Sequence, residues 1–285
     1  MSAVGLTSHR AFLRALGAAR QIELTAYVVG DGGLKRALEA AADRGARVRV
    51  TLERAPYARE TARARALRAC NRATVAALRR HGAEAHLTRR GEASLHLKAA
   101  LLDDRGFLDD RNWTRDGDTI VATSRPSDLA LIRSAFAGDA RSDAHLALRK
   151  DRALELEAEL IARTPAQVPI EVETESFGPS VVTRALGERA ARGGVVRLLV
   201  GARELREDNS AERAALREVR RAGVEVRACN ANEKFCLAGG AGWIGSANAT
   251  LGEPDALDWG MRCGGARAIA SLHARFEARW AGAIV

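Results

Sequence analysis

Long apolar runs, cysteines and aromatic residues are scarce in the 285-residue sequence, and each shortage excludes a class of protein. No segment approaches the ~18 consecutive apolar residues that a membrane span requires, so we expect no integral membrane segment. The N-terminal stretch MSAVGLTSHRAFLRALGAAR also lacks the long apolar run and the small-residue cleavage site of a signal peptide. A cytoplasmic location follows as an expectation.

The few cysteines show no paired spacing; they are Cys70, Cys229, Cys236 and Cys263. We interpret them as reduced thiols of a cytoplasmic protein. Cys229 and Cys236 as metal ligands are the alternative, but an unpaired cysteine is more often a small buried apolar residue. The sequence also has no HExxH motif and no glycine-rich nucleotide loop, so no metal and no cofactor is predicted.

Aromatic residues make up only 4% of the chain, which argues mildly against stacking on single-stranded nucleic acid. Cations, in contrast, are plentiful. The formal net charge of +9 arises from 41 arginines and four lysines against 36 acidic residues. This excess suggests an anionic partner such as nucleic acid, phospholipid headgroups or phosphate esters. The charge is spread along the chain, and genome composition is an alternative explanation of the arginine content.

The chain contains an internal repeat, which is the strongest indication of its architecture. The stretch that begins IELTAYVVGDGG at Ile22 resembles the stretch that begins IEVETESFGPS at Ile170, 148 residues later. Later parts of the two copies follow in the same order, at offsets that shorten to 141 and then to 136 residues. The shortening is that expected of loops of different length between matching elements.

Each copy predicts the same series of strands and helices. The predicted strands are 22–29, 47–53, 83–88 and 118–123 in the first copy, and 170–176, 195–200, 224–229 and 257–263 in the second. The predicted helices are 33–44, 58–81 and 127–138, and 180–192, 210–222 and 266–281. Gly82 and Gly223 are predicted to end the second helix of each copy. Alternating strands and helices favour an α/β fold with a mixed sheet and helices on its faces.

One 17-residue segment occurs in both copies and carries the candidate site. We call HLKAALLDDRGFLDDRN, residues 96–112, the first motif segment, and NEKFCLAGGAGWIGSAN, residues 232–248, the second motif segment. Lys98 matches Lys234, so two of only four lysines occupy equivalent positions. The other equivalent residues used below are Asn112 and Asn248, His96 and Asn232, and Asp103 and Gly239.

The pattern around His96 indicates chemistry rather than packing. In an extended strand alternate residues point the same way, so His96 and Lys98 project from one face. Leucine and alanine surround them, and such a buried strand accommodates a histidine or a lysine poorly. A hydrogen-bonded core histidine is the alternative. The repetition of the lysine in the second copy favours the functional interpretation.

The two motif segments resemble the signature of the phospholipase D superfamily. That signature is His-x-Lys, four residues, Asp, a short spacer and Gly-Ser-x-Asn, usually present twice. The first copy retains His96, Lys98, Asp103 and Asn112, with Asp109-Asp110 in the place of Gly-Ser. The second copy retains Lys234, Gly245, Ser246 and Asn248, with Asn232 for the histidine and Gly239 for the aspartate. The resemblance covers nearly the whole chain.

The resemblance implies an α/β fold of two pseudo-repeated halves, each a mixed β-sheet flanked by helices, with the site at their interface. We expect residues 1–145 to form the first half, 146–169 a connecting helix and linker, and 170–285 the second half. Pro165 and Pro169 are expected to stop helix formation in the linker. A monomer is expected, and a homodimer that supplies a missing group is the alternative.

The resemblance also implies a metal-independent phosphodiesterase without a cofactor. His96 becomes the nucleophile that forms a phosphohistidine, and Asp103 supports the architecture of the catalytic set. The phosphate-binding residues would be Lys98, Asn112, Asn232, Lys234, Ser246 and Asn248. The substrate would be a phospholipid or a nucleic acid, and the reaction hydrolysis or transfer.

Asn232 is the departure that matters, because an amide can hydrogen-bond a phosphate but cannot shuttle a proton near neutral pH. General acid help is worth ~10²–10⁴-fold, so its loss would cripple an enzyme without silencing it. The substrate can have a good leaving group, or another acid can replace the histidine; the candidates are Glu233, His86 and the pair Asp109-Asp110. Asp110 is expected either near His96, orienting its ring, or in a tight turn. The alternative function is a binding module for phosphodiesters or nucleic acid.

Overall fold

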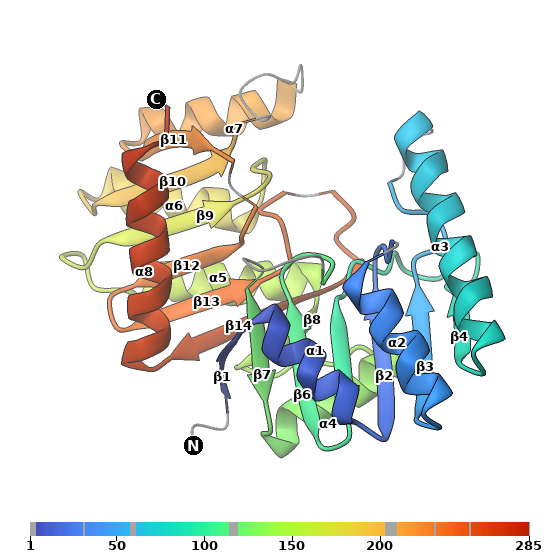
Figure 1. Cartoon of the computed structure of the whole chain (residues 1–285). Coiled ribbons are helices and arrows are strands. Elements are labelled where there is room, and N and C mark those ends of the chain that lie inside the picture. Colours follow the sequence, from blue (N-terminus) through green and yellow to red (C-terminus); the bar gives the residue numbers. More distant parts are fainter. Residues whose placement is uncertain are drawn as a thin grey trace. The chain divides into compact units, whose positions relative to one another are not determined.

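The computed structural model describes residues 4–30, 32–57, 61–113, 119–202, 210–230, 232–250 and 252–284 (Figure 1). The chain divides into two compact units. The first unit comprises Met1–Arg141 and Asp255–Asp258, and the second comprises Ser142–Pro254 and Trp259–Val285. Within the described ranges, no helix is long and apolar enough to cross a membrane. The expected α/β class is confirmed, whereas the expected domain boundaries stay a prediction.

Each unit contains a seven-stranded sheet with helices on its faces. The strands of the first sheet are β1 (Val4–Thr7), β2 (Gln21–Ala26), β3 (Arg47–Leu52), β4 (Glu84–Leu87), β5 (Ala99–Leu102), β6 (Arg105–Asp109) and β7 (Ile120–Thr123). Those of the second are β8 (Leu146–Arg149), β9 (Ile170–Thr174), β10 (Val196–Gly201), β11 (Glu225–Cys229), β12 (Phe235–Ala238), β13 (Ala241–Gly245) and β14 (Leu257–Gly264). The helices are α1 (His9–Ala18), α2 (Gly33–Asp43), α3 (Ala62–Arg80), α4 (Pro126–Phe136), α5 (Lys150–Arg163), α6 (Val181–Ala191), α7 (Ser210–Arg221) and α8 (Ala266–Ala281). Residues 58–60 and 118 of the predicted elements lie outside the described residues.

The two sheets have one topology, which establishes the repeat in three dimensions. The first sheet has the order β1-β7-β6-β5-β2-β3-β4, and the second reads β8-β14-β13-β12-β9-β10-β11 in the matching direction. In both sheets three strands pair in parallel, β2, β3 and β4 in the first and β9, β10 and β11 in the second. Strands β1, β7, β6, β5 and β2 pair antiparallel in the first sheet, and β14, β13, β12 and β9 do so in the second. Even the register is shared, since Ile22 pairs with Leu102 and Ile170 pairs with Ala238.

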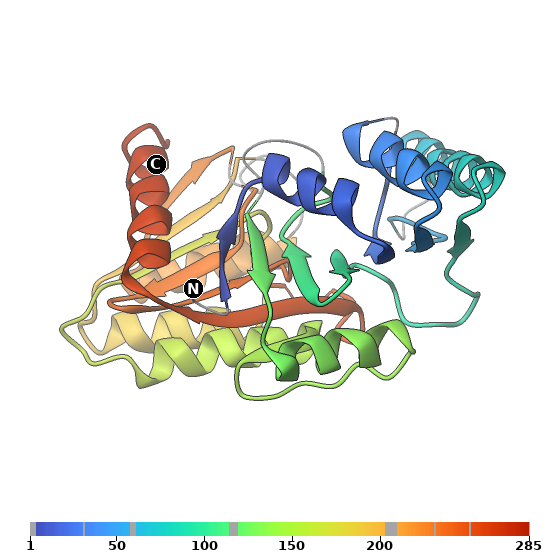
Figure 2. The ribbon, with the colours of Figure 1, turned by 60° about the horizontal axis from the view of Figure 1, so that its bottom comes forward.

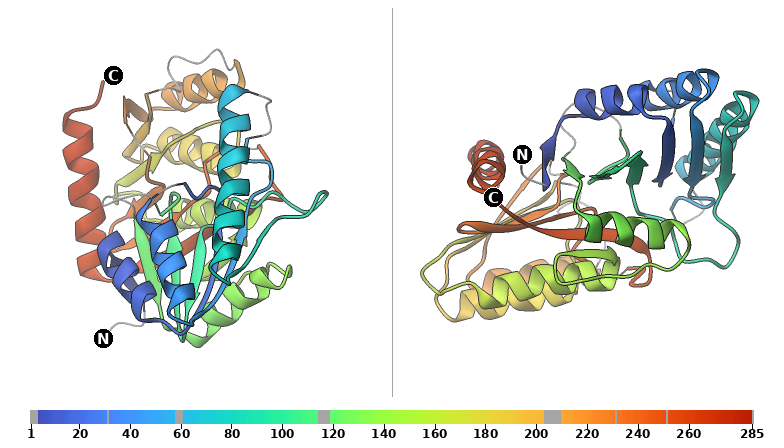
Figure 3. Two further views of the ribbon diagram at one scale, coloured as in Figure 1. Left: turned by 45° about the vertical axis from the view of Figure 1, so that its right-hand side comes forward. Right: turned by 90° about the horizontal axis from the view of Figure 1, so that it is seen from below.

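The helices cover the two faces of each sheet unequally. In the first unit, α1, α2 and α3 lie on one face and α4 on the other (Figure 2). In the second unit, α5 and α6 lie on one face and α8 crosses the other (Figure 3). The apolar residues of α2 form the side that packs against the sheet. Leu34, Leu38 and Ala41 recur every three or four residues, and all three are buried.

Glycine follows the third helix of each unit, which the sequence predicts as the second helix of each copy. Gly82 follows α3 with a φ of 83°, and Gly223 follows α7 with a φ of 102°. Both angles lie in the left-handed region that glycine adopts without a steric penalty. The chain can therefore turn directly from each helix into the next strand.

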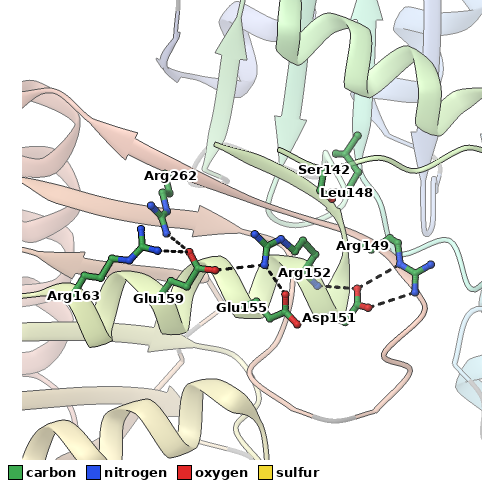
Figure 4. A network of polar contacts seen from close by, with 9 residues as sticks. All are labelled: Ser142, Leu148, Arg149, Asp151, Arg152, Glu155, Glu159, Arg163 and Arg262. Atoms are coloured by element: carbon green, nitrogen blue, oxygen red, sulfur yellow. Dashed lines mark hydrogen bonds and ion pairs between the residues drawn. The ribbon is translucent and has the colours of Figure 1, made fainter. Parts of the chain in front are cut away.

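The segment 146–169, expected as a connector, supplies structural elements of the second sheet. It contains the edge strand β8 and the helix α5, which occupy the places of β1 and α1. Glu159 on α5 ties the helix to β14 through Arg262, 2.8 Å away, and also pairs with Arg152 and Arg163 (Figure 4). Exposed pairs of this kind are worth little singly, so their main effect is to fix the direction of α5.

Each unit has its own hydrophobic core. In the first, the rings of Phe12 and Trp113 stack with centroids 4.3 Å apart, and Phe107 meets Phe12 edge-on. Trp113 directly follows the first motif segment, so the end of that segment is anchored in the core. In the second, Val172 and Trp243 belong to the core cluster. The motif segments are therefore built on rigid elements.

Glu157 on α5 provides a test of this packing. Its side chain is 2% exposed, and burial raises its carboxyl pKa from the ordinary 4.5 to about 8. Between these values the folded protein keeps a proton that the unfolded chain releases, so stability falls as pH rises from 4.5 to 8. Glu157→Gln is expected to remove this pH-dependent loss of folding stability, which amounts to about 1.4 kcal/mol per unit of pKa shift. Urea unfolding at pH 4.5 and pH 9 measures it. Equal pH slopes for the variant and the wild type would contradict the burial of this carboxyl group.

Candidate functional site

The two motif segments form matching hairpins at the centre of each sheet. β5 and β6 form the first hairpin, and β12 and β13 form the second. Each lysine comes just before its hairpin, and its carbonyl oxygen accepts a hydrogen bond from the far strand. The Asp109 amide donates to Lys98 over 2.9 Å, and the Gly245 amide donates to Lys234 over 3.0 Å. The lysines thus occupy one structural position in both units.

His96 is held by a buried carboxylate. Its Nδ1 lies 2.9 Å from Oδ2 of Asp258, and its backbone amide donates to the Leu257 carbonyl over 2.8 Å. Residues 255–258 belong to the first unit, so both contacts are internal to that unit. The imidazole is 26% exposed and the Asp258 side chain 2%. Because Nδ1 donates its hydrogen to this carboxylate, Nε2 is the unprotonated ring nitrogen, and its lone pair is available to another partner.

Tyr27, which follows β2, lies between the two reactive side chains of the first unit. Its ring meets the His96 ring edge-on with centroids 4.9 Å apart. The ammonium of Lys98 lies 5.8 Å from the same ring, within the range of a cation–π contact. Lys98 is 1% exposed. His96 and Lys98 are therefore neighbours around one aromatic ring, as the His-x-Lys spacing predicts.

The two asparagines of the motif segments make the same contact. Oδ1 of Asn112 accepts from the Val28 amide over 3.3 Å, and Oδ1 of Asn248 accepts from the Ser176 amide over 3.2 Å. Val28 and Ser176 are equivalent in the repeat, since they are separated by 148 residues. Each asparagine therefore binds the backbone just beyond the end of the central parallel strand of its unit.

Asp110 and Ser246 occupy a shared structural position, where the side chain of each accepts a backbone amide. Asp110 receives the Thr119 amide on Oδ1 over 2.8 Å. Ser246 receives the Trp259 amide on Oγ over 3.4 Å, and its own amide donates to the Trp259 carbonyl. Both are buried. The expectation that Asp110 orients the His96 ring stays a prediction, and Asp258 is the carboxylate beside Nδ1. The turn interpretation fits, since Asp109 accepts from the Trp113 amide over 2.7 Å.

Asp103 lies at the opposite end of β5 from Lys98. Its carboxylate accepts from the Gln21 amide over 2.9 Å and from the Arg20 amide over 3.1 Å. Its φ is 53°, and the equivalent Gly239 has a φ of 64°. The same left-handed turn is thus made by an aspartate in one unit and a glycine in the other. The structure gives Asp103 an architectural position and does not bring it to His96.

The second motif segment has a different electrostatic balance. The ammonium of Lys234 lies 2.9 Å from Oε2 of Glu175 and 3.0 Å from the Asn232 carbonyl. Asn232 donates from its side-chain amide to the Asn230 carbonyl over 2.9 Å. Lys234 is 3% exposed and Glu175 is 49% exposed. A carboxylate therefore accompanies the lysine where the first unit has a tyrosine.

Two other residues named as replacement acids lie elsewhere. Glu233 is fully buried, and its carboxylate pairs with Arg275 at 2.6 Å and Arg279 at 2.8 Å on α8. His86 is exposed on the edge strand β4. The ion pairs hold Glu233 towards the helix that covers the sheet, and neither contact connects it to Asn232.

One group of potential metal ligands occurs among the described residues, and it lies away from the motif segments. Ligand atoms of Glu171, His273 and Glu277 lie within 4.8 Å of one another. Arg197 pairs with both glutamates, so a guanidinium already supplies the positive charge there. The four cysteines are free thiols.

Sequence reasoning missed Asp258, Tyr27 and Glu175. Asp258 is far from His96 in sequence, and no spacing rule connects them. Tyr27 and Glu175 could have been found, because the repeat aligns them with each other at the end of the central strand. A polar or aromatic residue directly after a buried strand is the available signal.

Comparisons with known proteins support the fold. No protein-family model matches the sequence, and no curated protein matches it. The structure is similar to polyphosphate kinase from Porphyromonas gingivalis, with 17% identity, a TM-score of 0.70 and coverage of 96% of this chain and 46% of that chain. It is also similar to phosphatidylserine synthase from Haemophilus influenzae Rd KW20, with 10% identity, a TM-score of 0.65 and coverage of 97% and 86%. The chain thus spans less than half the length of the polyphosphate kinase.

The contact between Asp258 and His96 predicts the tautomer of the ring. We expect a proton on Nδ1 and none on Nε2 in the wild type, because an ionised carboxylate can only accept. Asp258→Asn should shift the population towards the Nε2-protonated form, visible in nitrogen-15 spectra of the imidazole. His81, which pairs with Asp43 at 2.8 Å, is the internal reference. An unchanged His96 spectrum beside an unchanged His81 spectrum would contradict the proposed orientation.

The position of Asp103 predicts an effect on stability alone. Asp103→Ala loses two backbone hydrogen bonds and keeps a strained φ, so we expect a loss of about 1–2 kcal/mol. Asp103→Asn retains an acceptor and tolerates this φ, so its loss should be smaller. Urea unfolding measures both. A shifted His96 imidazole spectrum in either folded variant would instead tie Asp103 to the site.

Proposed function

The chain has the fold of the phospholipase D superfamily, to which these solved structures belong, and we propose that it cleaves phosphodiesters through His96. The observation that carries the proposal is the hydrogen bond from Nδ1 of the ring to the buried carboxylate of Asp258. It holds Nε2 as the nucleophile in a partly exposed position. A histidine that served only the core would not need a second buried charge to orient it.

In the proposed reaction, Nε2 of His96 attacks phosphorus and forms a P–N bond while the P–O bond to the leaving group breaks. The leaving oxygen departs with the bonding electrons. Water then attacks phosphorus and forms a P–O bond, while the P–N bond breaks and its electron pair returns to Nε2. The proton that the water loses passes to solvent, and His96 is regenerated. Asp258 stabilises the positively charged ring of the intermediate. Lys98 and the amide NH₂ of Asn112 offset the charge that develops on the phosphate oxygens.

The proposal extends to the second unit, where Lys234, Ser246 and Asn248 are the phosphate-binding residues. Their equivalence to the first motif segment supports this role. Asp103 is left out of the catalytic set, since its bonds are architectural. Without a second histidine, no efficient general acid protonates the leaving oxygen. The favoured substrates therefore have leaving groups that are stable as anions.

The test is hydrolysis of bis(p-nitrophenyl) phosphate in excess EDTA, because an aryl leaving group needs little protonation. We expect activity that survives chelation and falls at least about 10³-fold in His96→Ala, since the nucleophile is removed. Asp258→Asn should lower kcat about 10²-fold or more with little change in KM, since it acts through the ring orientation. His81→Ala, a surface histidine variant, is the matched control.

Equal rates for wild type, His96→Ala and His81→Ala would reject the catalytic proposal. The alternative is then a binding module for anionic polymers, and one feature of the first unit favours it. Helix α3 carries six arginines and no acidic residue: Arg63, Arg65, Arg68, Arg72, Arg79 and Arg80. Arg63 lies 5.5 Å from the exposed ring of Tyr57. Salt-dependent binding of a single-stranded oligonucleotide, weakened by Arg63→Ala, would support this alternative.

A further inference from the structure

The ion pair of Lys234 with Glu175 is a difference in charge between the surroundings of the two motif lysines. In the second unit the ammonium has a carboxylate oxygen at 2.9 Å. The lysine is buried and the glutamate is half exposed, so the carboxylate lies on the solvent side of the cation. An anion that approaches Lys234 from solvent therefore meets a negative charge first.

The repeat shows that this carboxylate is a replacement and not a requirement of the fold. Glu175 follows β9 at the place where Tyr27 follows β2. The strand pairing around both positions is the same, and the lysine of the first unit lies beside an aromatic ring. The fold thus tolerates a neutral residue at this position, and the charge at Glu175 calls for another explanation.

Resting on the proposed function, we propose that Glu175 sets the charge class of the substrate. The carboxylate offsets the positive charge of Lys234. The second unit therefore accepts a phosphodiester, which carries one negative charge, and rejects phosphomonoesters and polyphosphates. A phosphomonoester carries nearly two negative charges at neutral pH. Glu175 is accordingly a specificity-determining residue.

The physical argument is the dependence of Coulomb energy on charge. At a fixed distance the carboxylate repels a dianion with twice the energy with which it repels a monoanion. Removal of Glu175 therefore multiplies the affinity for a dianion by the square of the factor for a monoanion. A gain of about threefold for the diester becomes a gain of about ninefold for the monoester.

The experiment is calorimetric titration at pH 8 with two probes, diphenyl phosphate as the diester and phenyl phosphate as the monoester. Wild-type protein should bind the diester more tightly. Glu175→Gln should bind the monoester about tenfold more tightly than wild type does, with a smaller gain for the diester. Glu175→Asp retains the charge and should keep the wild-type preference. Glu188→Gln removes an exposed carboxylate that pairs with Arg192 on α6, and should change neither affinity.

The outcomes separate this inference from the function on which it rests. Diester binding with the same monoester-to-diester ratio in wild type and Glu175→Gln overturns the role of Glu175 alone. Binding of neither probe to the wild type overturns the proposed function as well. Thermal unfolding of each variant identifies loss of fold. If Glu175→Gln does not fold, an unchanged ratio in folded Glu175→Ser rejects the inference.

Discussion

The pairing of each motif hairpin with the central parallel strand is the constraint on which the candidate site depends. β5 lies antiparallel to β2, and β12 lies antiparallel to β9, in an identical register. Because side chains alternate along a strand, a slip by one residue would turn every side chain to the other face. The shared register therefore places Lys98 and Lys234, and the two asparagines, at equivalent positions. The backbone bonds from Asp109 and Gly245 close each hairpin at the same point.

The two units have matching backbone geometry around the motif segments but different side-chain chemistry. The left-handed turn after the first strand of the hairpin uses Asp103 in one unit and Gly239 in the other. The position after the hairpin uses Asp110 or Ser246 to accept a backbone amide. These exchanges preserve the architecture. The exchanges of His96 for Asn232 and of Tyr27 for Glu175 change the charge and the proton chemistry instead. The second unit therefore retains the backbone of the first motif segment while its charged and titratable side chains differ.

The succession of strands and helices in the two copies was predictable, because apolar periodicity and the repeat can be recognised in the sequence. The glycines that end α3 and α7 were predicted from the same local rules. The edge strands β1 and β8 were not predicted, since both precede the points, Ile22 and Ile170, at which the sequence repeat begins. Helix α5 was predicted as a helix, but its place in the second sheet required knowledge of the partners of β8.

The sequence by itself determined the α/β class, the duplication and the two motif segments, because spacing and repetition are visible in the order of the residues. Only the tertiary structure decided what surrounds the reactive groups. Asp258 reaches His96 across 162 residues, and Glu175 reaches Lys234 across 59. The bonds of Asp103 to the start of β2 likewise separate it from the site. Contacts of this kind depend on how strands pair, and strand pairing is set by burial of the whole sheet rather than by neighbours in sequence.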